Sequence, residues 1–250
     1  MKILLTNDDG IYADGLLSLY KQLKKVGDCL VVAPDGQKSS VGHGITLNTP
    51  IWCKKVHRKG KLFGYAISGT PADCVKFGVS VLLKRPPDVV VSGINLGDND
   101  GCSVFYSGTV AGAREAALLG IPSVAVSLAT FVDPDYEFAA KCAADIVRKL
   151  KSKRIPKGTF LNVNVPHMNA RRIKGIKMTK QGMDPIHGYF HKRKDPHGND
   201  YYWLSGKPPF KIQPDNSDTI ALRQGFVTVT PIHVDSTDYV SLEEIQEWDV

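Results

Sequence analysis

The chain has 250 residues, of which 42 % are hydrophobic and 23 % are charged, a composition of globular proteins that excludes a disordered or fibrous chain. Lysine and arginine number 32 against 25 acidic residues, for a formal net charge of +7. No apolar run approaches the roughly 18–20 residues of a membrane-spanning helix, and the first residues do not have the pattern of a signal peptide. We therefore expect a cytoplasmic protein with no membrane partner and with one large domain, or one domain and an appended subdomain.

The positive charge is concentrated in one part of the chain. Residues 151–195 hold twelve basic and two acidic side chains, whereas residues 215–250 hold eight acidic and one basic. Clustered lysine and arginine favour nucleic-acid binding, because they neutralise phosphates. The simpler explanation is a solvated face or a basic arm that meets an acidic tail in an oligomer. Since no nucleic-acid-binding motif accompanies the 151–195 window, we expect no nucleic-acid partner and keep that function as the alternative.

Up to about residue 150, short apolar runs alternate with helical patterns. In chain order we expect strand 2–6, helix 14–26, strand 29–33, a strand pair at 46–56 and 62–67, helix 71–84, strand 88–92, helix 109–119, strand 123–127, helix 136–150 and strand 160–165. Alternating elements of this kind predict an α/β fold, with a mainly parallel sheet between two layers of helices.

After Pro166 the pattern changes. Residues 167–225 are rich in Gly, Pro, His, Lys and Arg and contain brief apolar runs at 173–178 and 201–204. Such a stretch is too long for a structureless loop in a compact domain, so we expect a protruding hairpin arm that packs on another subunit. A strand at 226–231 and an acidic helix at 241–248 follow. The sequence thus predicts a catalytic core at 1–166 and a C-terminal extension at 167–250.

Two adjacent carboxylates, Asp8 and Asp9, directly follow the first expected strand in the run Asn7-Asp8-Asp9-Gly10. Ligands of open parallel sheets bind beyond the carboxyl ends of strands, near the point where the strand order reverses. Paired carboxylates there repel each other unless a cation compensates them. The alternative role, in which Asp9 or Asp14 caps the following helix, needs one carboxylate. The pair therefore favours a metal site.

Two further motifs follow strands of the same expected sheet. Asn95 ends the run Ser-Gly-Ile-Asn after strand 88–92, and a doubly wound sheet would bring it close to Asp8 and Asp9. The run Tyr-Ser-Gly-Thr at 106–109 precedes a helix, and its free N–H groups and hydroxyls suit a phosphate. Ser-Gly-Thr is an equally good helix cap, so that motif leaves both roles open.

The polar loop 34–44 follows the second expected strand and overhangs the same edge of the sheet. It offers Lys38, Ser39, Ser40 and His43 as anion or metal contacts, but its spacing is not that of a P-loop. The composite is an oxygen-rich site of Asp8, Asp9 and Asn95 with the hydroxyl of Ser39 or Ser40. Oxygen ligands of this kind select Mg²⁺ or Mn²⁺, and a phosphate-binding helix end beside them indicates phosphoryl chemistry.

Seven stretches carry a resemblance to a known family: ILLTNDDG at 3–10, VVAPD at 31–35, GTPADCV at 69–75, VVVSGIN at 89–95, YSGTVAGAREAALLGIPSVAVS at 106–127, LNVNVP at 161–166 and VTPIHVD at 229–235. They resemble the survival protein SurE family of divalent-metal-dependent nucleoside-monophosphate phosphatases. The resemblance covers nearly the whole chain. It implies a Rossmann-like core with a C-terminal extension exchanged between subunits, as a homodimer or homotetramer.

Residue by residue, the resemblance implies one divalent metal ion per subunit, held by Asp8, Asp9, Ser39 and Asn95. It places the phosphate contacts on Asn99, Ser107, Gly108 and Thr109, to which the loop 34–44 would add Lys38 and His43.

Two positions depart from the family pattern. Lys38-Ser39-Ser40 stands where Arg-Ser and a Gly or Ala are common, and Asp98 stands where Pro is common. Lys38 keeps a positive charge but lacks the two-pronged donor of arginine, and Asp98 adds negative charge close to the metal site.

The functional hypothesis is therefore hydrolysis of nucleoside 5′- and 3′-monophosphates to nucleoside and phosphate, with short-chain polyphosphate as a further substrate. A metal-activated water would attack phosphorus, and Asp8 or Asp9 would act as the catalytic base. A rival class, the haloacid-dehalogenase-like phosphatases, expects Asp-x-Asp after the first strand, and the adjacent Asp8 and Asp9 do not have that spacing.

Overall fold

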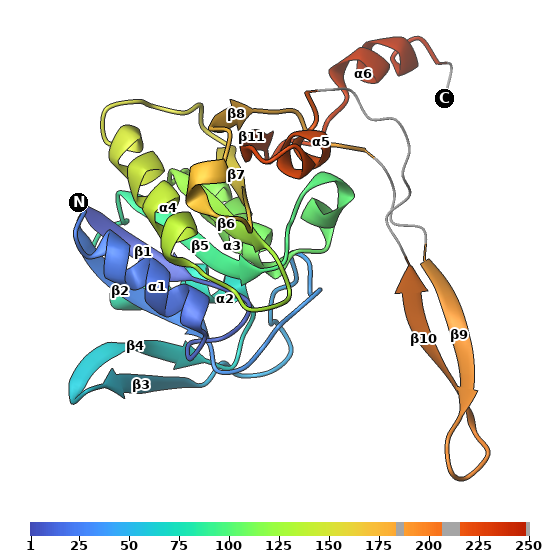
Figure 1. Ribbon diagram of the computed structural model, residues 1–250, viewed down its shortest axis with the longest axis horizontal. Coiled ribbons are helices and arrows are strands. Elements are labelled where there is room, and N and C mark those ends of the chain that lie inside the picture. Colours follow the sequence, from blue (N-terminus) through green and yellow to red (C-terminus); the bar gives the residue numbers. More distant parts are fainter. Residues whose placement is uncertain (184–187, 207–215, 249–250) are drawn as a thin grey trace.

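The computed structural model describes residues 1–183, 188–206 and 216–248. Its centre is a nine-stranded sheet in the order β3-β4-β2-β1-β5-β6-β7-β11-β8 (Figure 1). The strands are β1 (Lys2–Thr6), β2 (Asp28–Pro34), β3 (Cys53–Arg58), β4 (Lys61–Ile67), β5 (Val89–Leu96), β6 (Ser123–Ala129), β7 (Thr159–Pro166), β8 (Ile176–Met178) and β11 (Val227–His233). Neighbours pair in parallel except β3 with β4 and β7 with β11. The predicted mainly parallel α/β fold is confirmed.

Helices cover both faces of this sheet because its central strands are apolar on both sides. The helices are α1 (Asp14–Leu23), α2 (Pro71–Phe77), α3 (Gly108–Leu118), α4 (Glu137–Leu150), α5 (Asp218–Arg223) and α6 (Tyr239–Ile245). In β1, Ile3 and Leu5 pack with α1 and α4, whereas Leu4 packs with α2 and α3 on the opposite face. None of the helices in the described ranges is long and apolar enough to cross a membrane.

The C-terminal part contributes to the sheet and also forms a hairpin. β11 returns beside β7, and the short strand β8 pairs with β11 at the edge. β9 (Gly188–Lys194) and β10 (Asp200–Gly206) form an antiparallel two-stranded hairpin that lies away from the sheet (Figure 1). A hairpin is thus present where the sequence predicted an arm. Residues 184–187 and 207–215 of the expected arm lie outside the described residues, and the division of the chain at residue 166 stays a prediction.

Several expected elements differ from the structure. The helix expected over 14–26 ends at Leu23, and the helix expected over 241–248 is α6, Tyr239–Ile245. The strand expected over 46–56 begins at Cys53, because the main-chain N–H and the hydroxyl of Thr46 bind Asp73 instead of a strand partner. The helix expected over 71–84 is α2 followed by a π-helical turn, Gly78–Leu82. β5 continues through Asn95, because its pairing with β6 resumes there after an irregularity.

Candidate active site

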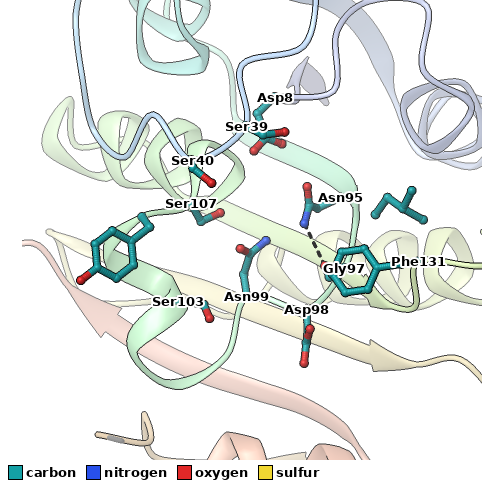
Figure 2. A pocket seen from close by; sticks show the side chains of 12 residues that line it. Asp8, Ser39, Ser40, Asn95, Gly97, Asp98, Asn99, Ser103, Ser107 and Phe131 are labelled. Atoms are coloured by element: carbon teal, nitrogen blue, oxygen red, sulfur yellow. Dashed lines mark hydrogen bonds between the residues drawn. The ribbon is translucent and has the colours of Figure 1, made fainter. Parts of the chain in front are cut away.

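A cavity of about 260 Å³ opens where β1 and β5 end. The two strands are parallel neighbours, as the sequence predicted for the point where the strand order reverses. The cavity is lined by Asp8, Ser39, Ser40, Asn95, Leu96, Gly97, Asp98, Asn99, Ser103, Tyr106, Ser107 and Phe131 (Figure 2). Five of the predicted site residues are among them: Asp8, Ser39, Asn95, Asn99 and Ser107.

Asp8 is a nearly buried carboxylate, 4 % exposed, that lies against the start of α3. The Thr109 hydroxyl donates a hydrogen bond to Asp8 Oδ1. Gly108 permits this approach, since a Cβ there would lie 2.8 Å from the Asp8 Cβ. Burial raises the pKa of Asp8 to about 6, with the charge of Asp9 adding to the rise and the bonds from Thr109 opposing it. The carboxylate is therefore held in place but incompletely compensated.

Asp9 lies beside Asp8 but does not line the cavity. Its Oδ2 accepts a hydrogen bond from the Leu96 main-chain N–H at 3.4 Å, and burial raises its pKa. Within the described residues, neither Asp8 nor Asp9 forms a salt bridge. Two adjacent, partly buried carboxylates without a protein cation are the arrangement that a divalent cation stabilises.

Neutral oxygens complete this arrangement. Asn95 Nδ2 donates to the Gly97 carbonyl at 2.8 Å, and its carboxamide oxygen is directed to the side of the cavity where Asp8 and Ser39 lie (Figure 2). The Ser39 hydroxyl accepts a hydrogen bond from Gln37 at 2.8 Å. No group of three or more His, Cys, Asp or Glu that could hold a metal is found in the described part of the chain. The present set pairs two carboxylates with neutral oxygens, which suits Mg²⁺ or Mn²⁺ better than Zn²⁺.

The start of α3 forms the other side of the cavity. Ser107 is its N-cap, with the side chain accepting from the Val110 N–H at 3.1 Å. Helix N-termini carry free N–H groups and a positive dipole end, which favour anions. Gly108 and Thr109, predicted as phosphate contacts, do not line the cavity; both contact Asp8.

Lys38 and His43 were also predicted to contact phosphate, and neither lines the cavity. The Lys38 main-chain N–H donates to the Asp8 carbonyl at 2.7 Å, which ties the loop to β1. His43 Nε2 lies 2.9 Å from Glu115 on α3, and Lys76 Nζ lies 2.7 Å from the same carboxylate. Although burial opposes it, these two partners hold the pKa of Glu115 below its usual range. The side chain of His43 thus anchors the loop that carries Ser39.

Sequence reasoning missed the side chains that support Asn99. Asn162 and Asn164 on β7 and Ser127 on β6 all form hydrogen bonds to it. The sequence did contain a signal. Two asparagines at alternate positions of a buried strand place polar side chains on the same face, and such side chains need hydrogen-bond partners. Ser103 and Phe131 also line the cavity, and nothing in their local sequence identifies them; Tyr106, which lines it too, belongs to the Tyr-Ser-Gly-Thr run.

Comparison with known proteins identifies the family. The family described as Survival protein SurE matches residues 3–187. The chain belongs to the SurE family. It is 45 % identical to the 5′-nucleotidase SurE of Syntrophobacter fumaroxidans over all of both chains, and 47 % identical to that of Petrotoga mobilis over 99 % of each. The crystal structure of the SurE protein from Aquifex aeolicus matches with a TM-score of 0.86 and 40 % identity over 98 % of each chain.

Ser40, next to Ser39 in the polar loop, has an unusual main-chain conformation, with a φ of +57°. This left-handed region favours glycine. The serine places a hydroxyl on the cavity wall at the cost of some backbone strain.

Proposed function

We propose that this protein is a 5′-nucleotidase that hydrolyses nucleoside 5′-monophosphates to nucleoside and inorganic phosphate. Membership of the SurE family supports the activity. The observation that carries it is the cavity itself, where the buried Asp8 carboxylate, with Asp9 beside it and no salt-bridge partner among the described residues, lies against the N-terminal end of α3 and hydroxyl and amide groups line the space. Such a site offers a cation on one side of a phosphate and N–H and O–H donors on the other.

In this proposal Asp8, Asp9, Ser39 and Asn95 hold one divalent metal ion, Mg²⁺ or Mn²⁺. When bound, the ion supplies positive charge against the phosphoryl oxygens and lowers the pKa of water. Ser107 and Asn99 bind the phosphate oxygens from the α3 side. Asp8 or Asp9 accepts the proton of the attacking water at a carboxylate oxygen. The water oxygen bonds to phosphorus as the bond to the nucleoside oxygen breaks. The proton taken up by the carboxylate then passes to that oxygen, so the nucleoside leaves as its alcohol and the carboxylate is regenerated.

The proposed substrate range extends beyond 5′-monophosphates. Nucleoside 3′-monophosphates and short polyphosphates present the same phosphoryl group. Five of the twelve residues that line the cavity are the proposed metal and phosphate contacts, and none of these proposed contacts requires a 5′ position.

The test is phosphate release from a panel of nucleoside 5′- and 3′-monophosphates and tripolyphosphate, with Mn²⁺, with Mg²⁺ and with EDTA. We expect release with metal and none with EDTA. Asp8→Asn should lower kcat/KM by about 10³-fold, because it removes charge from the proposed metal site. Asp14→Asn is the matched control, since Asp14 is an exposed acid in the first turn of α1. It should leave activity within about twofold.

Two outcomes would contradict the proposal. One is an active, folded Asp8→Asn variant. The other is no release from folded protein with any metal; salt-dependent binding of nucleic acid that survives Asp8→Asn would then favour the alternative based on residues 151–195.

We also infer that the protein is a homodimer or homotetramer in which the β9–β10 hairpin packs on another subunit. The hairpin exposes several large apolar side chains, namely Tyr189, Phe190, Tyr202, Trp203 and Leu204. An isolated two-stranded hairpin is marginally stable, and packing on a second subunit would bury these side chains.

A further inference from the structure

Asn99, which lines the cavity, is held at its main chain by two asparagines of β7. The Asn99 N–H donates to Asn164 Oδ1 at 2.8 Å. The Asn99 carbonyl accepts from Asn162 Nδ2 at 2.7 Å and from Asn164 Nδ2 at 3.3 Å. Asn162 and Asn164 are both fully buried. The carboxamide of Asn164 therefore engages both polar groups of the Asn99 main chain, much as a neighbouring strand would.

The Asn99 side chain is held separately, from β6. Its Nδ2 donates to the buried Ser127 hydroxyl at 2.8 Å. A carboxamide nitrogen carries two hydrogens, so one remains for a ligand in the cavity. Asn99 lies centrally among the labelled residues of the cavity (Figure 2). With main chain and side chain both fixed, its orientation is set before a ligand enters.

Buried asparagines in a strand are costly unless their polar atoms are used. The carboxamide of Asn164 uses its polar atoms on Asn99. Asn164 supplies one acceptor and one donor to the same residue, which the acceptor-only carboxylate of an ionised aspartate cannot reproduce. The loop around Asn99 follows β5 and has no strand partner beyond Leu96, whose pairing with Leu128 ends the β5–β6 ladder. The β7 asparagines replace that missing ladder at the point where Asn99 lies.

We propose that Asn164, Asn162 and Ser127 are positioning residues that hold Asn99 in the orientation that binds the phosphate group of the substrate. This rests on the proposed function, in which Asn99 is a phosphate contact. The three residues touch Asn99 and do not line the cavity. Their effect is therefore on affinity for phosphate and on turnover, and not on the metal site of Asp8, Asp9, Ser39 and Asn95.

The experiment compares Asn164→Ala and Ser127→Ala with the wild-type chain. The affinity for inorganic phosphate is measured by calorimetry with saturating Mg²⁺, the affinity for Mn²⁺ by electron paramagnetic resonance, and KM and kcat with a nucleoside monophosphate. Thr228→Val is the matched control. Thr228 is buried directly opposite Asn164 in the β7–β11 ladder, and its hydroxyl has no hydrogen-bond partner in the described structure.

We expect Asn164→Ala to weaken phosphate binding about tenfold or more and to raise KM, as the loss of fixed hydrogen bonds predicts. Mn²⁺ affinity should stay within about twofold, and Thr228→Val should match the wild type throughout. Ser127→Ala should weaken phosphate binding about three- to tenfold. If Asn164→Ala does not fold, Ser127→Ala provides the test instead.

Unchanged phosphate affinity in the folded variants would overturn the proposal. So would parallel losses of phosphate and Mn²⁺ affinity, or an equal loss in Thr228→Val, since each would indicate a general structural effect. Absence of wild-type turnover would instead contradict the proposed function. Because calorimetry of phosphate needs no turnover, the two failures can be told apart.

Discussion

The position of the Asp8 carboxylate depends on the residues at the start of α3. The Thr109 hydroxyl fixes one of its carboxylate oxygens, and Gly108 leaves the space that the carboxylate occupies. A helix N-terminus stabilises an anion, so α3 holds Asp8 as well as facing the cavity. Of the two roles that the sequence left open for the Tyr-Ser-Gly-Thr motif, the structure shows the helix cap, formed by Ser107; Ser107 also lines the cavity, and phosphate binding stays a prediction.

Thr109→Val should weaken Mn²⁺ binding and lower kcat/KM by about 10- to 100-fold, the usual effect of removing a partner that orients a metal-binding carboxylate. Valine has the shape of threonine but no hydroxyl, so Asp8 would lose its side-chain hydrogen bond. Thr109→Ser keeps the hydroxyl and should recover most of both quantities. Mn²⁺ titration and initial rates provide the measurement, and equal behaviour of the valine and serine variants would show that the hydroxyl has no orienting role.

At the scale of elements, Asp73 joins α2 to the segment that leads away from the Ser39 loop. Its carboxylate accepts hydrogen bonds from the Thr70 N–H at 2.9 Å, from the Thr46 N–H at 3.1 Å and from the Thr46 hydroxyl at 2.6 Å. Thr70 in turn caps α2. Burial opposes ionisation, but these donors outweigh it and hold the pKa of Asp73 below its usual range.

Asp73→Ala should lower the free energy of unfolding by about 1–3 kcal/mol at pH 7. Because the folded-state pKa is depressed, the stabilisation is complete above the unfolded pKa of about 3.9 and is lost as the pH falls through the lower folded value. Urea denaturation of the wild type and of Asp73→Ala between pH 7 and pH 3 should thus show a difference in the free energy of unfolding that shrinks below about pH 4. Asp145→Ala, at an exposed site on α4, is the control, expected to change stability by about 0.5 kcal/mol or less. A difference that is constant with pH would contradict this explanation.

The local sequence pattern predicted the elements whose formation depends on their own residues and on the adjacent strand. The apolar runs of β1, β5 and β6 and the helical spacing of α1 and α4 are local properties, and each element is present where it was expected, although β5 runs on to Leu96 and α1 ends at Leu23. The segment before Cys53 has strand-like residues, but tertiary hydrogen bonds to Asp73 override that preference. β8 and α5 are short and lie against β11; a brief apolar run at 173–178 was the signal for β8, and α5 was not predicted.

The site residues also divide into those that the sequence pattern could predict and those that it could not. Asp8, Asn95 and Ser107 follow or end elements at one edge of the sheet, so topology alone brings them together. The supporting contacts of His43 with Glu115, and of Asn99 with Asn164, join residues 72 and 65 positions apart. Side-chain contacts over such separations depend on the packed fold and not on local sequence.

At the scale of the whole molecule, the β9–β10 hairpin lies apart from the core (Figure 1). Phe190 and Leu204 are directly opposite each other across its two strands, and they are 69 % and 65 % exposed. Within the hairpin, Lys192 and Asp200 pair at 2.6 Å, so its polar groups are in part satisfied internally. The exposed apolar pair is the feature that a second subunit would cover.

Replacing both Phe190 and Leu204 by serine should therefore raise the dissociation constant of the oligomer by about 10²-fold or more, since burial of each such side chain contributes roughly 1.5–3 kcal/mol. Sedimentation or light scattering over a concentration series measures the change. Trp52→Ser is the control, because Trp52 is 70 % exposed but lies just before β3, far from the hairpin in sequence. A wild-type chain that is monomeric at high concentration would contradict the inferred assembly. An oligomer that the double variant leaves intact would show that another surface holds the subunits together, and that the hairpin has a different partner.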